Sequence, residues 1–169
     1  MLELGAGAGR NALHLAGQGF EVTAWDTRVD ELDQLAKEKE LPIQTGVRDI
    51  RTLNALSPER HFDVFVSNHV LHYLSRQEAL LLIKEMQERT NTDGLNVIAA
   101  FTENGDFYRD TPDTENFYLK AEELKDLYVD AGWQILEYVE AEVEAKKKRP
   151  DGSHMVNVSA KLIAKKLGN

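Results

Sequence analysis

The chain has 169 residues, 42% of them hydrophobic and 29% charged, which is typical of one globular domain. Its net charge of −9 argues against a general nucleic-acid or anionic-membrane surface. Because Cys is absent, a disulfide scaffold, thiol catalysis and a zinc site built on thiolates are excluded. No apolar run is long enough to span a membrane and no signal peptide is visible, so we expect a cytoplasmic protein.

Short apolar runs alternate with amphipathic stretches along the chain, which indicates an α/β sheet. In the first part of the chain the pattern predicts strands at 1–4, 20–25 and 42–47, and helices at 10–18 and 29–39. A turn-rich segment with Ser57 and Pro58 follows. The next strand, 62–66, is apolar on both faces and is therefore expected to be buried within the sheet.

The second half of the chain continues the alternation and then changes character. It predicts a helix at 76–89, a turn at 92–94, a strand at 96–101 and a helix near 121–130. Residues 102–118 carry four aromatic side chains without a clear period. An antiparallel pair, 133–144 and 155–165, closes the chain. We therefore expect a Rossmann-like open sheet that is mostly parallel, with helices on both faces.

A glycine loop, residues 5–9, joins the first strand directly to the first helix. Glycines allow a tight turn and let a ligand approach bare main chain, while the helix start supplies free N–H groups. The spacing is G-x-G-x-G, and Arg10 stands where a dinucleotide-binding loop would carry glycine or alanine. The loop therefore favours an uncharged nucleoside with an amino-acid tail over a pyrophosphate. The alternative is a glycine-rich turn that binds nothing.

Two carboxylates follow the next strands: Asp26 ends the second strand and Asp49 the third. Ligands of open parallel sheets bind outside the carboxyl ends of the strands, so both acids should converge on the glycine loop. A carboxylate accepts hydrogen bonds, so Asp26 suits two ribose hydroxyls and Asp49 an exocyclic adenine amine. The alternative is that both residues only cap the helices that follow them.

On these motifs the sequence resembles the class I S-adenosylmethionine-dependent methyltransferases, and most of all the tellurite-resistance methyltransferase (TehB) family. The segments that carry the resemblance are 4–11, 22–26, 62–67, 94–100 and 160–166. It implies a seven-stranded sheet with a C-terminal antiparallel hairpin. It also implies that residues 1–169 form a single methyltransferase domain that lacks the N-terminal segment of its relatives.

The resemblance assigns S-adenosylmethionine as the cofactor and gives its contacts. The methionine moiety would lie on Gly5, Ala6 and Gly7, the ribose on Asp26, and the adenine on Asp49 and Ile50, with Ser67 and Asn68 flanking the sulfonium. The same match adds Gly9, Arg10 and Asn11 to the cofactor-binding set.

A sulfonium methyl is already electrophilic, so the protein mainly has to align the reacting atoms and exclude water. A soft oxyanion such as tellurite needs no general base, and we expect neither a catalytic triad nor a metal. His69 is a candidate pocket residue, with simple packing as the alternative. Arg109, Phe107 and Tyr108 are candidate substrate contacts, and the basic run 146–149 is a weaker candidate because a solvated turn explains it better than a substrate role does.

These observations predict methyl transfer to a small-molecule acceptor, with tellurite or a related oxyanion as the candidate. Nucleic-acid and membrane partners are not expected, and the sequence does not indicate the oligomeric state. Two alternatives stay open. One is a degenerate member of the fold with a binding or regulatory role, and the other is a nicotinamide-dependent oxidoreductase, against which Arg10 counts.

Overall fold

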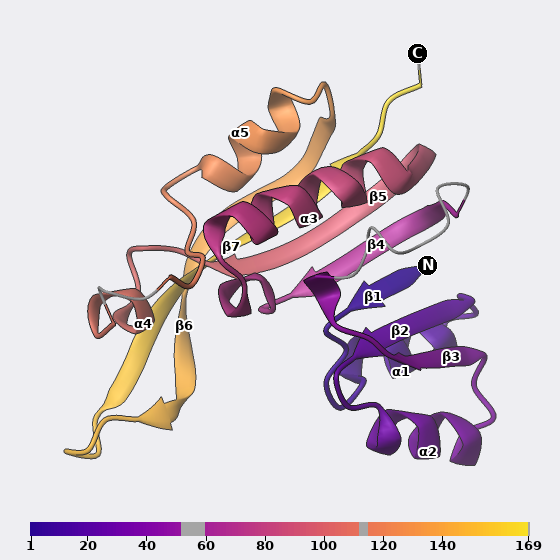
Figure 1. Cartoon of the computed structure of the whole chain (residues 1–169), viewed down its shortest axis with the longest axis horizontal. Helices are drawn as coiled ribbons and strands as arrows, with labels where there is room; N and C mark the ends of the chain where they lie inside the picture. Colours follow the sequence, from indigo (N-terminus) through magenta and orange to yellow (C-terminus); the bar gives the residue numbers. More distant parts are fainter. Residues whose placement is uncertain (52–59, 112–114, 169) are drawn as a thin grey trace.

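The computed structural model describes residues 1–51, 60–111 and 115–168. Seven strands form one sheet in the order β3-β2-β1-β4-β5-β7-β6 (Figure 1). The strands are β1 (Leu2–Leu4), β2 (Val22–Asp26), β3 (Ile43–Val47), β4 (Phe62–Asn68), β5 (Thr90–Phe101), β6 (Gln134–Lys148) and β7 (His154–Lys165). The strands β1 to β5 pair with one another in parallel, whereas β7 is antiparallel to both β5 and β6. The predicted Rossmann-like sheet with a C-terminal hairpin is confirmed.

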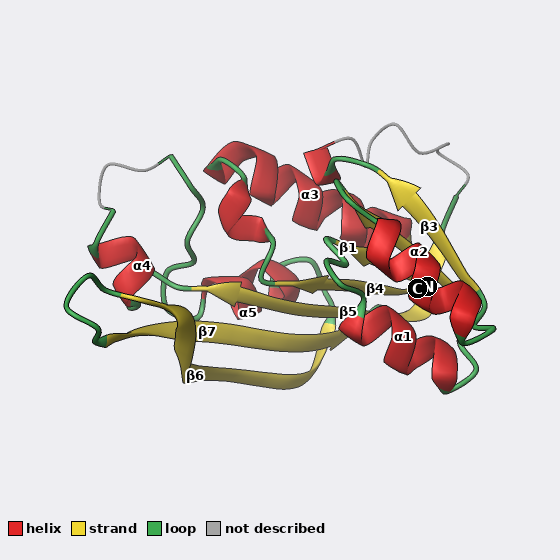
Figure 2. Ribbon diagram, turned by 90° about the horizontal axis from the view of Figure 1, so that it is seen from below, coloured by secondary structure: helices red, strands yellow, loops and turns green. Residues whose placement is uncertain are grey.

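Helices cover both faces of this sheet, and Figure 2 shows α1 and α3 on opposite sides of it. The helices are α1 (Arg10–Gly17), α2 (Asp30–Glu38), the 3₁₀ turn η2 (Leu71–Tyr73), α3 (Arg76–Arg89), α4 (Asp106–Arg109) and α5 (Glu123–Val129). The longest, α3, begins at a capping box in which the Glu78 amide donates to Ser75 Oγ and the Ser75 amide donates to Glu78 Oε2. In the described part of the chain, no helix is long and apolar enough to cross a membrane.

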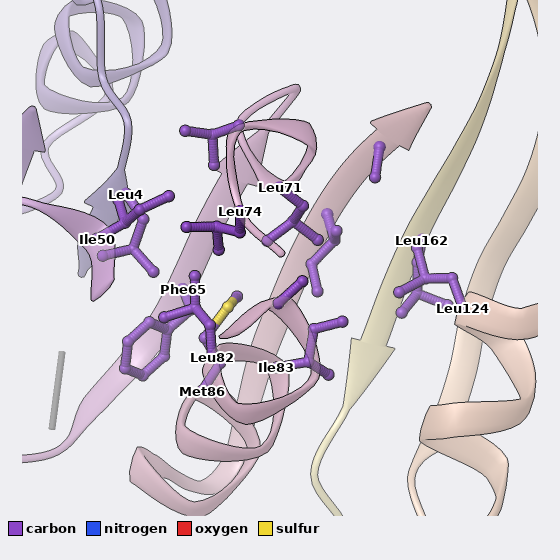
Figure 3. Close-up of a cluster of buried hydrophobic side chains, with 14 of the residues drawn as sticks. Leu4, Ile50, Phe65, Leu71, Leu74, Leu82, Ile83, Met86, Leu124 and Leu162 are labelled. Carbon is purple, nitrogen blue, oxygen red and sulfur yellow. The ribbon is translucent and has the colours of Figure 1, made fainter. Parts of the chain in front are cut away.

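The main hydrophobic core lies between the sheet and α3. Phe65 of β4 is completely buried and packs with Leu82 and Met86 of α3 (Figure 3). The same cluster continues through η2 to Ile50 and, beyond β5, to Leu124 of α5. A smaller cluster under α1 contains Ala12, Ala16, Val22, Ala24 and Leu32. These two clusters fix the strand ends around which the candidate site is built.

The turn predicted at 92–94 is wrong as a strand boundary. β5 begins at Thr90, and the irregularity lies inside the strand: pairing with β4 shifts register between Phe62 and Val64. Asp93 has a positive φ of 64° there, and its amide donates to the Lys166 carbonyl. The turn residues therefore form a bulge that the neighbouring C-terminal segment pairs with, a contact that no local pattern contains. The segment around Ser57 and Pro58 lies outside the described residues.

Candidate functional site

The glycine loop leaves β1 through three glycines with positive φ, namely Gly5, Gly7 and Gly9. A Cβ atom at Gly5 would lie 2.3 Å from Val70 Cγ2, and one at Gly9 would lie 2.2 Å from Leu32 Cδ1. These two glycines are therefore required by packing. At Gly7 a Cβ would meet no atom within 4 Å, so the main chain there faces open space.

Asp26 closes β2 directly opposite this bare main chain. The Gly7 amide donates to Asp26 Oδ2 at 2.8 Å, and the Arg28 amide donates to Oδ1 at 3.1 Å. The Thr27 hydroxyl also donates to Oδ1, at 3.3 Å. A carboxylate has about four acceptor sites, so these three hydrogen bonds leave room for a hydroxyl donor, chiefly at Oδ2. The structure thus brings Asp26 and the glycine loop together, as the parallel-sheet rule predicts.

Asp49 and Ile50 follow β3 at the same edge of the sheet. Arg51 holds the Asp49 carboxylate through its side chain, with Nε 3.0 Å from Oδ1 and Nη2 2.5 Å from Oδ2. These hydrogen bonds lower the pKa of Asp49, and a further hydrogen bond from the Arg51 amide adds to the effect. Ile50 is buried against the core. Arg51, which the sequence analysis missed, therefore competes with any ligand amine for Asp49.

A cavity of about 560 Å³ lies between these elements. The glycine loop contributes Gly5 and Gly7, the ends of β2 and β3 contribute Asp26, Thr27, Arg28, Arg48, Asp49, Ile50 and Arg51, and the segment after β4 contributes His69, Val70, Tyr73 and Leu74. Cavities that hold a small molecule or cofactor have volumes of roughly 300–1,000 Å³. The position outside the carboxyl ends of parallel strands is where open α/β sheets bind ligands.

Other predicted cofactor contacts do not line this cavity. Asn11, Ser67 and Asn68 line a second, mostly apolar cavity of about 470 Å³, which also borders β5 and β7. Asn11 Nδ2 donates to the buried Glu3 Oε1 at 2.9 Å, and burial raises the pKa of Glu3. Ala6, Gly9 and Arg10 line neither cavity. We place the candidate site at the first cavity, because among the described residues bare main chain and two carboxylates meet there and not in the second cavity.

His69 follows β4 at the inner wall of the candidate site. It has a positive φ of 52°, its amide donates to the Ala99 carbonyl at 2.7 Å, and its ring stacks on Phe101 at 4.5 Å between centroids. Nε2 lies 2.8 Å from Ser159 Oγ of β7. Burial lowers the pKa of His69, and Lys161 and Arg10 lower it further; burial lowers the pKa of His72 to about 4.

The predicted substrate contacts Phe107, Tyr108 and Arg109 lie in α4, beside the β6–β7 hairpin (Figure 1). Phe107 packs edge-on against Phe101, Tyr108 packs edge-on against Tyr118, and Arg109 pairs with Asp106 at 3.5 Å. None of the three lines the candidate site as the structure describes it.

The basic run beside α4 is partly neutralised. Arg149 pairs with Asp106 at 3.0 Å and with Asp110 at 3.4 Å, and the Val156 amide also donates to Asp106. The side chains of Lys146 and Lys147 lie outside the described part of the structure. The substrate roles of α4 and of this run stay predictions.

The chain matches one known protein family over most of its length. The family model described as "Tellurite resistance protein TehB" matches residues 1–161. The chain belongs to the TehB family. The predicted resemblance is thereby confirmed.

Two TehB relatives from Haemophilus influenzae agree with this assignment. A "Probable S-adenosyl-L-methionine-dependent methyltransferase TehB" of strain 10810 is 37% identical over 98% of this chain and 57% of its own length. The crystal structure of TehB from H. influenzae superposes with a TM-score of 0.84 at 32% identity, covering 98% of this chain and 56% of that one. The chain therefore spans just over half the length of these relatives.

More distant structures share only the fold. A Burkholderia thailandensis 1,6-didemethyltoxoflavin-N1-methyltransferase, crystallised with 1,6-didemethyltoxoflavin and S-adenosylhomocysteine, matches with a TM-score of 0.69 at 21% identity, over 99% of this chain and 70% of its own. The [4+2]-cyclase SpnF matches with a TM-score of 0.72 at 16% identity, over 99% of this chain and 74% of its own. Since the fold hosts different chemistries, function has to be argued from the site.

Proposed function

We propose that this chain transfers a methyl group from S-adenosylmethionine to a small-molecule acceptor. The observation that carries the proposal is the pairing of Gly7 with Asp26: open main chain on one side of the cavity and a carboxylate bonded to it on the other. The TehB relatives named as S-adenosylmethionine-dependent methyltransferases support it.

The residues that line the cavity fit the parts of this cofactor. Gly5 and Gly7 would lie along the methionine portion, Asp26 would accept hydrogen bonds from the ribose hydroxyls, and Asp49 and Ile50 would contact the adenine. The cofactor supplies an electrophilic methyl carbon on sulfur. The chain's own task is to hold the acceptor in line with that carbon and to keep water out. The cofactor roles predicted for Ala6, Gly9, Arg10, Asn11, Ser67 and Asn68 stay predictions.

Tellurite or a related oxyanion is the first acceptor to test, because the family name points to it. Such an oxyanion attacks through an exposed lone pair and has no proton to lose in the step. An anion beside His69 would also be stabilised by Lys161 and Arg10, whose positive charges already act on the His69 ring.

The test is calorimetry of the chain with S-adenosylmethionine and S-adenosylhomocysteine, followed by tellurite-dependent release of S-adenosylhomocysteine. We expect both nucleosides to bind. Binding of neither would refute the proposal in favour of a degenerate binding domain, and protection from thermal unfolding by NAD alone would favour an oxidoreductase. The cytoplasmic location and the absence of nucleic-acid and membrane partners stay predictions.

A further inference from the structure

We infer that His69 accepts a proton from the methyl acceptor, so that the site also serves nucleophiles that must lose one, a hydroxyl or a ring N–H. The inference rests on the proposed function and names a second class of acceptor for the same cavity. A lone-pair oxyanion does not need such a group, and the residue is therefore unexplained by tellurite chemistry alone.

The first argument is that the imidazole of His69 is held in place from three sides. The main chain of His69 is held in the left-handed region by the hydrogen bond that its amide donates to the Ala99 carbonyl, and Phe101 stacks on one face of the ring. Ser159 holds Nε2 at 2.8 Å from a fully buried position. A non-glycine residue with positive φ is strained and persists where the surroundings require it. A side chain that only filled space would not need this combination.

The second argument concerns which ring nitrogen can reach a ligand. His69 lines the cavity, whereas Ser159 does not. The Ser159 hydroxyl occupies Nε2, which leaves Nδ1 as the ring nitrogen that can meet a ligand. Nδ1 has no hydrogen-bond partner among the residues that the structure describes. A neutral imidazole with the proton on Nε2 donates to Ser159 and keeps a lone pair on Nδ1. This tautomer is intrinsically favoured for neutral histidine, and an unsatisfied acceptor is tolerated more readily than an unsatisfied donor.

The third argument is the charge around the ring. Lys161 of β7 and Arg10 of α1 are charged groups that act on it, and the ring of His72 of η2 lies 5.0 Å from that of Phe101. Burial and these two cations lower the pKa of His69, so the imidazole is neutral at pH 7 and able to take a proton.

The chemical step balances without any other reagent. A lone pair on the acceptor's oxygen or nitrogen forms a bond to the methyl carbon, while the carbon–sulfur bond breaks and its electron pair stays on sulfur. The acceptor's proton moves to Nδ1 of His69, which becomes an imidazolium and later releases that proton to water. Ser159 is a positioning residue in this step, since it acts only through His69.

The test has one readout that does not depend on turnover. Long-range proton–nitrogen NMR of the histidine rings at pH 7.5, assigned with His69→Asn, should show Nε2 protonated and Nδ1 bare. In Ser159→Ala this preference should weaken. A proton on Nδ1 in the wild-type chain would overturn the inference, because that nitrogen would then donate rather than accept.

Turnover is measured with catechol as the hydroxyl probe, benzimidazole as the ring N–H probe, and tellurite as the oxyanion. We expect His69→Asn to lower turnover of a protic probe by about 100-fold or more, and far more than tellurite turnover. In the wild-type chain, turnover of the protic probes is expected to fall below pH 6.5, and this fall should be absent in His69→Asn. His154→Asn, in the exposed end of the β6–β7 hairpin, is the matched control and should change neither.

Each remaining result decides between the two proposals. If S-adenosylmethionine binds but neither protic probe is methylated, or if His69→Asn lowers both acceptor classes equally, the second acceptor class is refuted and the proposed function stands. If S-adenosylmethionine does not bind, the proposed function fails and this inference fails with it.

Discussion

Replacing Gly7 and Gly9 separately by alanine tests whether the cofactor lies on the glycine loop. Both glycines have positive φ, 55° and 81°, so a Cβ at either position costs roughly 1–2 kcal/mol of backbone strain. At Gly9 the new methyl would also lie 2.2 Å from Leu32 Cδ1, and overpacking of this kind adds about 1–3 kcal/mol. At Gly7 no atom lies within 4 Å of the methyl, so no packing cost is added.

The two variants should therefore separate stability from binding. Gly9→Ala is expected to lower the free energy of unfolding by about 2–5 kcal/mol, and Gly7→Ala by only about 1–2 kcal/mol. Gly7→Ala should instead weaken S-adenosylhomocysteine binding by at least 10-fold, because its methyl occupies the space that the cofactor needs.

Urea unfolding measures the first quantity and calorimetry with S-adenosylhomocysteine the second. Wild-type affinity in Gly7→Ala would show that the bare main chain at Gly7 is not a ligand surface, whatever its geometry suggests. A larger stability loss in Gly7→Ala than in Gly9→Ala would show that Gly7 is present for backbone reasons alone.

Three further predictions concern single side chains. Asp26→Ala removes the acceptor of the Gly7 amide and should weaken S-adenosylhomocysteine binding by about 1–3 kcal/mol in calorimetry; an unchanged affinity would remove Asp26 from the site. Tyr128→Phe leaves the buried Asn96 Nδ2, now 2.8 Å from the hydroxyl, without a partner, and should cost about 1–3 kcal/mol in urea unfolding, whereas a loss near zero would contradict this. His72 has a pKa of about 4 when folded against about 6.5 when unfolded, so the native chain should lose stability as the pH falls from 6.5 towards 4. Urea unfolding at pH 7.5 and 5.0 measures this loss in the free energy of unfolding. Between these pH values His72→Phe should lose about 1 kcal/mol less than the wild-type chain, and equal losses would refute the lowered pKa of His72.

Local patterns were sufficient for most of the fold. The helix predicted at 76–89 has those bounds in the structure, because Ser75 and Glu78 supply a start signal that needs no tertiary contact. The meeting of Asp26 with Gly7 was also predictable, since parallel strands deliver their carboxyl ends to one edge.

What the sequence could not predict depends on long-range register. His69 meets Ser159, 90 residues away, because Phe101 of β5 pairs with Ser159 of β7 and places that hydroxyl behind the ring. The capture of Asp49 by Arg51 is local, but it depends on side-chain conformations that spacing does not specify. The bulge at Asp93 likewise follows from pairing with the C-terminal segment.

A sheet shared with both a methyltransferase and a cyclase does not select between chemistries, so the selection has to come from side chains at the strand ends. In this chain the chemistry of those side chains differs from one strand end to the next. β2 and β3 lead into carboxylates, which can accept hydrogen bonds from a nucleoside. β4 leads into the His69 imidazole, whose pKa is lowered mainly by burial and further by Lys161 and Arg10. A neutral imidazole can take up a proton where an acceptor has to lose one. The nucleoside portion of the cofactor and the acceptor are therefore expected to occupy different ends of one cavity, with the methionine portion along Gly5 and Gly7 between them.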